Sequence, residues 1–184
     1  MKKALLLVLA LSVAMTASMA AAQDGGTIGL YGDANGVSCN VVGAAGVVTI
    51  YVIHELTTGT TASQFAITAN PGMIYLADQV QGGFLSLGGS QTGIALTYGS
   101  CLPGPINILN ILYSAVAPVA CSTLEVVPDP NALTGQIEGV DCAQTKTFPN
   151  GSVLTFDSDG TCSCGPRVPV EETNWGRVKS LYGN

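Results

Sequence analysis

The feature that most limits how this chain can fold is a series of short apolar segments between residues 27 and 164. Residues 47–56 show the clearest alternation of apolar and polar side chains, which places one face against a core and the other toward solvent. Turn-forming Gly, Pro, Asn and Asp separate the segments. This spacing predicts an all-β fold, an antiparallel β-sandwich. The expected strands are residues 27–31, 47–56, 64–69, 73–78, 84–87, 94–98, 106–116, 124–127, 136–140, 153–156 and 161–164.

One segment, residues 106–116, differs from the others because it is apolar on both faces. A strand with two apolar faces is expected to be covered on both sides. We therefore predict that this segment is a central strand. Its apolar side chains are Ile106, Ile108 and Leu112 on one face and Leu109, Ile111 and Tyr113 on the other.

The first 22 residues have the three parts of a secretory signal peptide. Lys2 and Lys3 are followed by an uncharged, mostly apolar segment from Ala4 to Met19, and small residues precede the expected cut after Ala22. Cleavage after Ala20 meets the same requirement. A permanent membrane anchor is the alternative, but the apolar segment of 16 residues is shorter than a membrane span of about 20. We expect a secreted protein, extracellular or periplasmic, with no membrane association after cleavage.

Cleavage would leave 162 of the 184 residues, enough for one domain with a core. Four basic and all twelve acidic residues lie in this part, so its formal net charge is −8. Such a surface repels phosphate groups, and we expect no nucleic acid among its partners. We divide the chain into a signal peptide (1–22), a β-sandwich domain (23–164), and a linker with a short C-terminal helix (165–184).

The C-terminal 20 residues differ in composition from the domain before them. Two prolines make residues 165–170 a linker or an edge segment, because proline cannot donate to a β-ladder. A short helix is expected next, with Trp175, Val178 and Tyr182 on one side. We expect this helix to dock on the sandwich or to trail from it. The alternative is a sorting or attachment element.

The cysteines indicate a disulfide-stapled domain. An even number of cysteines in an exported chain is typical of disulfides, here three. Cys162 and Cys164 lie two apart in an expected strand, so their side chains share a face and would not readily bond each other. We expect each to bond Cys121 or Cys142, which leaves Cys39 with Cys101. The six cysteines are Cys39, Cys101, Cys121, Cys142, Cys162 and Cys164.

A metal or redox site at Cys162-Ser163-Cys164 is the alternative to disulfides. The chain has one histidine and no Cys-x-x-Cys motif, which disfavours such a site. Asp33–Gly36 and Asp157–Gly160 resemble the beginning of a calcium loop, but the second lacks the glutamate that the loop requires at position 12. Both are good turn sequences, and we expect no metal and no cofactor.

His54 is the only histidine, so any Ser-His-Asp or Cys-His mechanism would have to use it. By alternation it shares a buried face with Val52 and Leu56, and we expect local partners for its ring nitrogens. No Gly-x-Ser-x-Gly motif, which marks the nucleophile of many hydrolases, accompanies it. These features do not favour nucleophilic catalysis.

Paired carboxylates are the other candidate for catalysis. A glycosidase needs two of them about 5 to 9 Å apart. Asp129, Glu138 and Asp141 cluster in the sequence, but in a Gly- and Pro-rich stretch that is more typical of solvated turns. We therefore expect no enzyme and no catalytic residue, with a carboxylate-dependent hydrolase as the alternative.

Residues 47–69 resemble the cohesin-like family of bacterial surface modules, which are immunoglobulin-related β-sandwiches. The resemblance rests on a long strand (47–52), a connection of small residues (57–62) and the segment Gln64–Thr68. It implies the sandwich fold. The cysteines and the expected helical tail depart from the cohesin pattern, so no dockerin-type partner is carried over.

The whole chain is also similar to a family of uncharacterised secreted bacterial β-sandwich proteins, a resemblance that implies no particular activity. It rests on Gly29–Asp33, Val127–Asn131 and Trp175–Tyr182. We predict a secreted, non-catalytic module that binds protein or carbohydrate at the cell surface or in the extracellular matrix. The alternative is a secreted, glycosidase-like hydrolase that uses carboxylates from residues 129–141.

Overall fold

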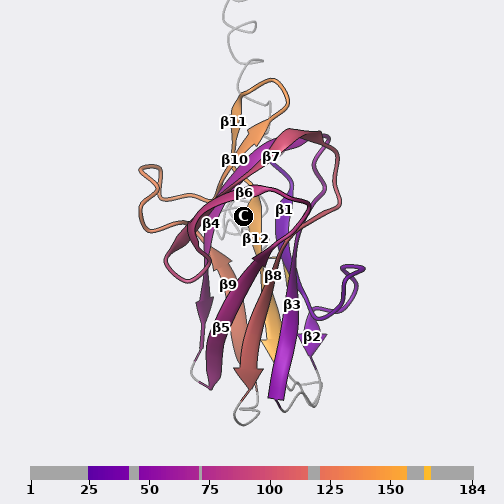
Figure 1. Cartoon of the computed structure of the whole chain (residues 1–184), viewed down its shortest axis with the longest axis vertical. Coiled ribbons are helices and arrows are strands. Elements are labelled where there is room, and N and C mark those ends of the chain that lie inside the picture. Colours follow the sequence, from indigo (N-terminus) through magenta and orange to yellow (C-terminus); the bar gives the residue numbers. More distant parts are fainter. Residues whose placement is uncertain (1–24, 42–45, 71, 116–120, 157–163, 167–184) are drawn as a thin grey trace, which may run out of the picture.

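The computed structural model describes residues 25–41, 46–70, 72–115, 121–156 and 164–166, and every helix or strand assigned within them is a β-strand (Figure 1). Every expected strand up to residue 156 overlaps an observed one, which confirms the all-β prediction. The expected strand at 161–164 lies almost wholly outside the described residues. The strands are β1 (Thr27–Tyr31), β2 (Asn40–Val41), β3 (Gly46–Glu55), β4 (Thr60–Ala69), β5 (Met73–Val80), β6 (Leu85–Gly89), β7 (Gly93–Leu102), β8 (Ile106–Ala115), β9 (Ser122–Val127), β10 (Glu138–Asp141), β11 (Lys146–Thr147), β12 (Asn150–Phe156) and β13 (Gly165–Pro166).

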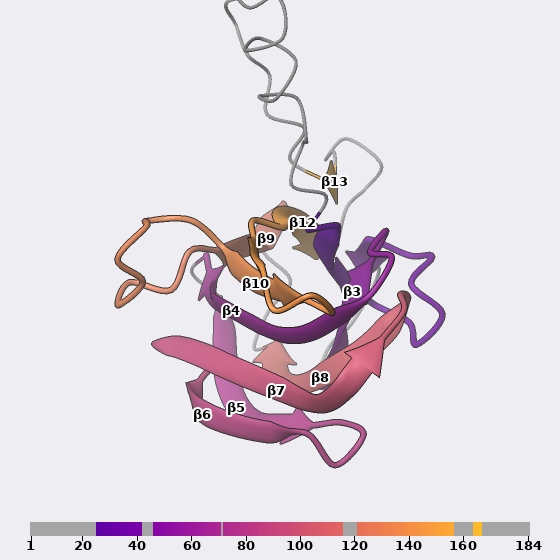
Figure 2. The ribbon, with the colours of Figure 1, turned by 90° about the horizontal axis from the view of Figure 1, so that it is seen from above.

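The strands form two curved sheets that share a continuous hydrogen-bonded path. β5, β8, β3 and β1 pair in that order and form what we call the β8 sheet. β6, β7, β4, β10 and β11 pair in that order and form the β4 sheet. β12 and β9 connect β1 to β4, so the strands enclose a common interior, seen from above in Figure 2. The apolar core draws on both sheets, with Ile50 and Ile111 from one and Phe65 and Ile94 from the other.

The expectation of a purely antiparallel fold needs a correction. β12 pairs in parallel with β1 and with β2, whereas the other ladders are antiparallel. A parallel pair needs a long connection between its strands. β1 and β12 meet this condition because nearly the whole domain separates them in sequence.

The alternation along β3 correctly predicts which side chains enter the core, up to the last residue. Ile50, Val52 and His54 are buried as expected. Leu56, which the same alternation places on the buried face, is 78% exposed. The strand ends at Glu55, and Leu56 takes a positive φ of 55°, so the alternation no longer applies to it.

The prediction that residues 106–116 are covered on both faces is wrong in part. β8 lies between β3 and β5, and its inward side chains are fully buried. Ile108 and Leu109 are both buried although they are neighbours, because the β3–β8 register shifts between Val52 and Ile53. Leu112 points to the other side, where it is only half-buried.

Two disulfides are described, and neither has the expected pairing. Cys39 bonds Cys164, and Cys101 bonds Cys142. Cys121 is also disulfide-bonded, and Cys162 lies outside the described residues. The expected Cys39–Cys101 pair is wrong because partners depend on which strands meet. β2 follows Cys39 and β13 follows Cys164, and both strands pair with β12.

At the C-terminal end, Gly165 and Pro166 pair with β12 as the short strand β13, so the expected linker begins as an edge segment. The expected helix with Trp175, Val178 and Tyr182 lies outside the described residues. Among the residues that are described, no helix is long and apolar enough to cross a membrane.

Candidate functional site

The candidate site begins where β7 departs from β4. Their ladder pairs Ala62 with Thr97 but Thr60 with Leu102, so β7 advances five residues while β4 advances two. Extra residues in one strand form a bulge, which bends the strand and re-aims its side chains. Gly99 lies within the bulge at a φ of 72°, a conformation that glycine adopts without strain.

Tyr98 is the last inward-facing residue of β7 before Gly99, and it is 5% exposed. The Tyr98 hydroxyl lies 2.7 Å from Ser63 Oγ and 3.4 Å from His54 Nδ1. His54 Nε2 lies 2.7 Å from the Gly25 carbonyl oxygen. Because a carbonyl only accepts, Nε2 carries the proton and Nδ1 accepts from Tyr98. The prediction of local partners for the His54 ring is therefore confirmed.

Burial acts on both titratable groups of this internal chain. Burial lowers the pKa of His54, and the hydrogen bond to the Gly25 carbonyl opposes this only in part. Burial likewise raises the pKa of the Tyr98 hydroxyl. Both groups are therefore neutral near pH 7, and the chain is a structural feature beneath the bulge.

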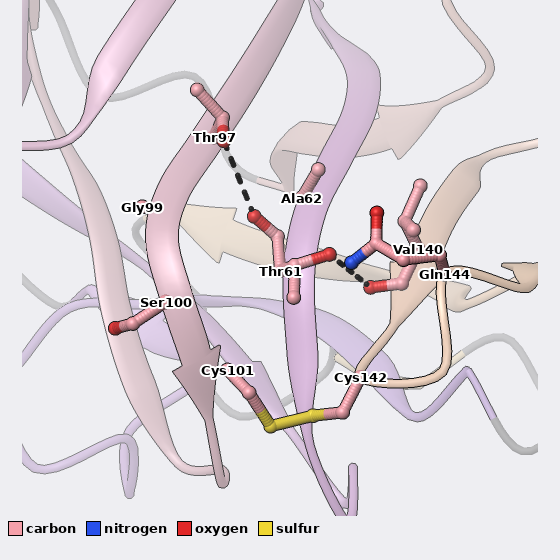
Figure 3. A pocket seen from close by; sticks show the side chains of 9 residues that line it. All are labelled: Thr61, Ala62, Thr97, Gly99, Ser100, Cys101, Val140, Cys142 and Gln144. Atoms are coloured by element: carbon pink, nitrogen blue, oxygen red, sulfur yellow. Dashed lines mark hydrogen bonds between the residues drawn. A yellow bond between two sulfur atoms is a disulfide. The ribbon is translucent and has the colours of Figure 1, made fainter.

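On its solvent side the bulge borders a hollow of about 470 Å³, shown in Figure 3. None of the residues around it carries a charge, in a chain with twelve acidic and six basic residues. β4, β7, β10 and the turn after β10 all contribute to its wall. The lining residues are Thr61, Ala62, Thr97, Gly99, Ser100, Cys101, Val140, Cys142 and Gln144.

Four residues with uncharged polar side chains line this hollow: Thr61, Thr97, Ser100 and Gln144. Thr97 Oγ1 donates a long hydrogen bond of 3.5 Å to the Thr61 carbonyl, and Thr61 Oγ1 donates to the Val140 carbonyl at 3.2 Å. Ser100 and Gln144 are exposed, and within the described part of the chain no hydrogen bond engages their side chains. Figure 3 shows the Gln144 amide pointing toward Thr61. The hollow therefore offers both donors and acceptors to a ligand.

The wall of the hollow is fixed by the Cys101–Cys142 disulfide, which joins the end of β7 to the residue after β10. Gly59 lies beneath it, and a Cβ atom there would come within 2.4 Å of Cys142 Sγ. Gln144 has a φ of 60°, a conformation that costs a residue other than glycine about 1 to 2 kcal/mol. Such strain persists only where the surroundings impose it, and it is common at functional sites.

A smaller hollow of about 110 Å³ continues from the larger one. The two share Ala62 and Val140, so together they follow β4 as far as Gln64. Ala62 and Ala95 are the small side chains of β4 and β7 in this region, and Glu138 lies at the far end. We call the two hollows together the β4 groove.

The carboxylates considered for a hydrolase each have a structural role. Burial opposes ionisation of Asp129, but hydrogen bonds from Gln64 and Asn131 outweigh it and lower the Asp129 pKa. The hydrogen bond from Lys146 lowers the pKa of Glu138, with a smaller contribution from a threonine hydroxyl. A glycosidase general acid needs a raised pKa, so both shifts have the wrong direction for that role.

The remaining predicted site residues take local structural positions. Asp141 accepts a hydrogen bond of 2.7 Å from the Thr145 backbone N–H. Asp33 accepts from the backbone N–H groups of Asn35 at 2.9 Å and Ser38 at 2.6 Å, so the Asp33–Gly36 turn is confirmed. Within the described ranges, no group of three or more His, Cys, Asp or Glu residues could hold a metal ion.

Among the groove residues, the sequence pattern singles out only the cysteines and Glu138. It ends the strand at Tyr98, whereas β7 continues through the bulge to Leu102. The one local signal is the Tyr98-Gly99-Ser100-Cys101 run, which interrupts the alternation. Such an interruption indicates an irregular strand, but it does not show that β4 and β10 complete a hollow there.

Comparisons with known proteins find similarity of fold alone. No family model matches the chain, and no curated protein matches it. Solved structures similar to it include a cohesin module from a family 33 glycoside hydrolase of Clostridium perfringens, at 9% identity and a TM-score of 0.46, covering 67% of this chain and 93% of that one. A non-cellulosomal cohesin from the archaeon Archaeoglobus fulgidus matches at 8% identity and a TM-score of 0.46, covering 71% and 89%.

A third solved structure, CaCohA2 from Clostridium acetobutylicum, matches at 12% identity and a TM-score of 0.44, covering 77% of this chain and 96% of that one. The first two of these structures are cohesins. The likeness concerns the arrangement of strands, and no site residue is carried over from it.

Proposed function

We propose that this protein is a secreted, non-catalytic binding module and that the β4 groove is its ligand site. The observation that carries the proposal is the larger hollow, with about 470 Å³ of space, four polar side chains in its lining and no charged one among the described residues around it. Pockets of about 300 to 1,000 Å³ with a few placed polar groups are typical ligand sites. The disulfide beside the hollow keeps it open without a ligand.

The positions of the reactive side chains support a role without catalysis. The only histidine is fully buried and has partners at both ring nitrogens. Asp129, Glu138 and Asp141 each accept hydrogen bonds from neighbouring residues. None of the three lines the larger hollow, so a ligand there meets hydroxyl and amide groups rather than an acid and a base.

Secretion is supported by the signal-like N-terminus together with the disulfides. Two described disulfides join residues 125 and 41 positions apart. Disulfides of this kind persist in oxidising compartments. An N-terminal sequence determination of the protein recovered from the culture medium should begin at Gln23, and recovery of the whole chain in the cytoplasm would contradict the proposal.

The ligand site can be tested by filling it. Ala62 lies on the floor of both hollows, and Ala62→Leu adds three carbon atoms there. Ala77→Leu, on the outward side of β5, is the matched control. We would titrate the mature protein with panels of neutral oligosaccharides and capped peptides and follow backbone amide NMR shifts. We expect shifts at the groove that Ala62→Leu weakens at least tenfold and that Ala77→Leu leaves unchanged.

Two outcomes would contradict the proposed site. The first is a ligand panel that moves no amide signal around the groove. The second is a ligand that binds the Ala62→Leu variant as tightly as the original protein. Release of a cleavage product from any panel member would contradict the non-catalytic role.

A further inference from the structure

We infer that the β4 groove takes an uncharged polypeptide segment in extended conformation, laid along β4. This inference rests on the proposed function and narrows its ligand from protein or carbohydrate to a peptide chain. It depends on three properties of the groove: the size of the floor side chains, the kind of polar groups and the absence of rings and charges from the larger hollow.

The floor allows another backbone to approach closely. Ala62 and Ala95 are the short side chains on adjacent strands, and Gly99 adds a position where a Cβ atom would meet nothing within 4 Å. Small residues at one surface of a sheet are typical of places where a second backbone approaches. The two hollows also follow one strand, so the space is elongated rather than round.

The polar groups suit amides. Each peptide unit offers one N–H donor and one carbonyl acceptor. Gln144 supplies both a donor and an acceptor, and Ser100 has a free hydroxyl that can serve as either. The Thr61 carbonyl lies where the bulge interrupts the ladder, and its contact with Thr97 is long at 3.5 Å. A peptide N–H could therefore replace that weak contact.

The kinds of side chain that do not line the hollows also favour a peptide ligand. Among the described residues no aromatic side chain lines either hollow, and the flat face of a sugar ring usually stacks on one. The larger hollow also lacks any charged side chain, so it gives no counter-ion to a charged ligand. The smaller hollow is bordered by the short or apolar side chains of Ala62, Ala95 and Val140, with Gln64 and Glu138 also in its lining, and its volume suits a small side chain.

The experiment compares four probes on the mature protein by amide NMR titration. The first is the capped peptide Ac-Ser-Val-Thr-Val-Ser-NH₂, and the second replaces both valines with proline, which removes two N–H donors. The third is the cationic peptide Ac-Lys-Val-Lys-Val-Lys-NH₂, and the fourth is the neutral pentasaccharide cellopentaose. Each probe is also titrated against the Ala62→Leu and Ala77→Leu variants.

We expect the first peptide to give saturable shifts at Thr61, Ser100 and Gln144, with an affinity at least tenfold above that of the proline peptide and of cellopentaose. Ala62→Leu should weaken it at least tenfold, and Ala77→Leu should change it less than twofold. Raising the salt concentration should not weaken it, because no ion pair forms.

The contrary outcomes separate the two proposals. If cellopentaose shifts the groove signals and the first peptide does not, the inference fails and the proposed ligand site stands. If no probe shifts them, the inference is overturned, and the wider panels then decide the proposed function. If the cationic peptide binds more tightly than the neutral one, and salt abolishes its binding, recognition is electrostatic and the inference is overturned.

Discussion

The two sheets of this molecule have similar alternating sequences but differ in how regularly their strands pair. In the β8 sheet, β3 and β8 stay paired from Gly46–Ala115 to His54–Ile106 with a single register shift. In the β4 sheet, the ladder between β4 and β7 breaks after Ala62 and resumes three residues out of step. In the β3–β8 ladder the one shift leaves the neighbours Ile108 and Leu109 both buried and opens no hollow between the strands that the structure describes. The interrupted ladder opens a hollow, so the irregular sheet is the one that carries the candidate site.

Two anchors hold the interruption in place. On the inside, Tyr98 contacts Ser63 and His54 through its hydroxyl. On the outside, Cys101 bonds Cys142 across the end of β4. The inner anchor holds Tyr98 at the start of the bulge. The outer anchor holds Cys101 near its end. Removing either anchor should therefore affect the β4 sheet and its groove more than the β8 sheet.

The largest effects should come from the disulfides. Replacing Cys101 and Cys142 together by serine should cost about 4 kcal/mol of unfolding free energy, by loop-closure entropy for a separation of 41 residues. The same change at Cys39 and Cys164, separated by 125 residues, should cost about 5 kcal/mol. Urea denaturation measures both. Only the first variant should lose groove binding, and equal loss in both would show that the disulfide beside the groove has no special role.

The next prediction tests the inner anchor by removing one oxygen atom, that of the Tyr98 hydroxyl. Tyr98→Phe should cost about 1 to 3 kcal/mol, because Ser63 is buried and the Nδ1 atom of His54 would lose its donor. Tyr113→Phe is the matched change on β8, where the hydroxyl accepts only from exposed Gln91. It should cost less than about 1 kcal/mol, since water can replace that contact. Equal losses in urea denaturation would contradict an anchoring role for Tyr98.

The regular sheet is the part that sequence alone predicts well. The period of two along β3 places Ile50, Val52 and His54 in the core because successive side chains of a strand point to opposite faces of the sheet. The prediction fails at Leu56, where the strand has ended and the backbone takes a positive φ. The local sequence pattern therefore predicts which side chains are buried only while the strand remains paired in its ladder.

The groove could not be predicted because its parts meet only in the folded chain. Cys101 reaches Cys142 because β7 and β10 pair with opposite edges of β4, an arrangement that no spacing in the sequence specifies. Gln144 and Thr61 are 83 positions apart, and neither residue type is distinctive. A glycine after Tyr98 indicates an irregular strand, but the direction in which the bulge opens depends on its neighbours.

A smaller effect concerns His54, which lies in the regular sheet and contacts Tyr98 of the interrupted one. Its folded pKa is below the unfolded value of 6.5, so the unfolded state binds more protons as the pH falls. The stability that the neutral His54 contributes is complete above about pH 6.5. Below that pH the free energy of unfolding declines by at most about 1.4 kcal/mol per pH unit. Urea denaturation from pH 7 to 5 should show this slope, and His54→Gln should remove it. An identical slope in the variant would assign it to other groups.

The smallest effect should come from the one charged pair at the far end of the groove. Lys146 Nζ lies 2.7 Å from Glu138 Oε2, and the lysine side chain is about half exposed, so Lys146→Met should change stability by less than about 0.5 kcal/mol. The affinity of the neutral peptide should change less than twofold, because neither charge lines the larger hollow. The cationic peptide, in contrast, should bind more tightly once Glu138 has lost its cationic partner. If the neutral peptide responds as strongly as the cationic one, the effect of Lys146→Met is not electrostatic, and the claim that the uncharged larger hollow sets the affinity of the neutral peptide is contradicted.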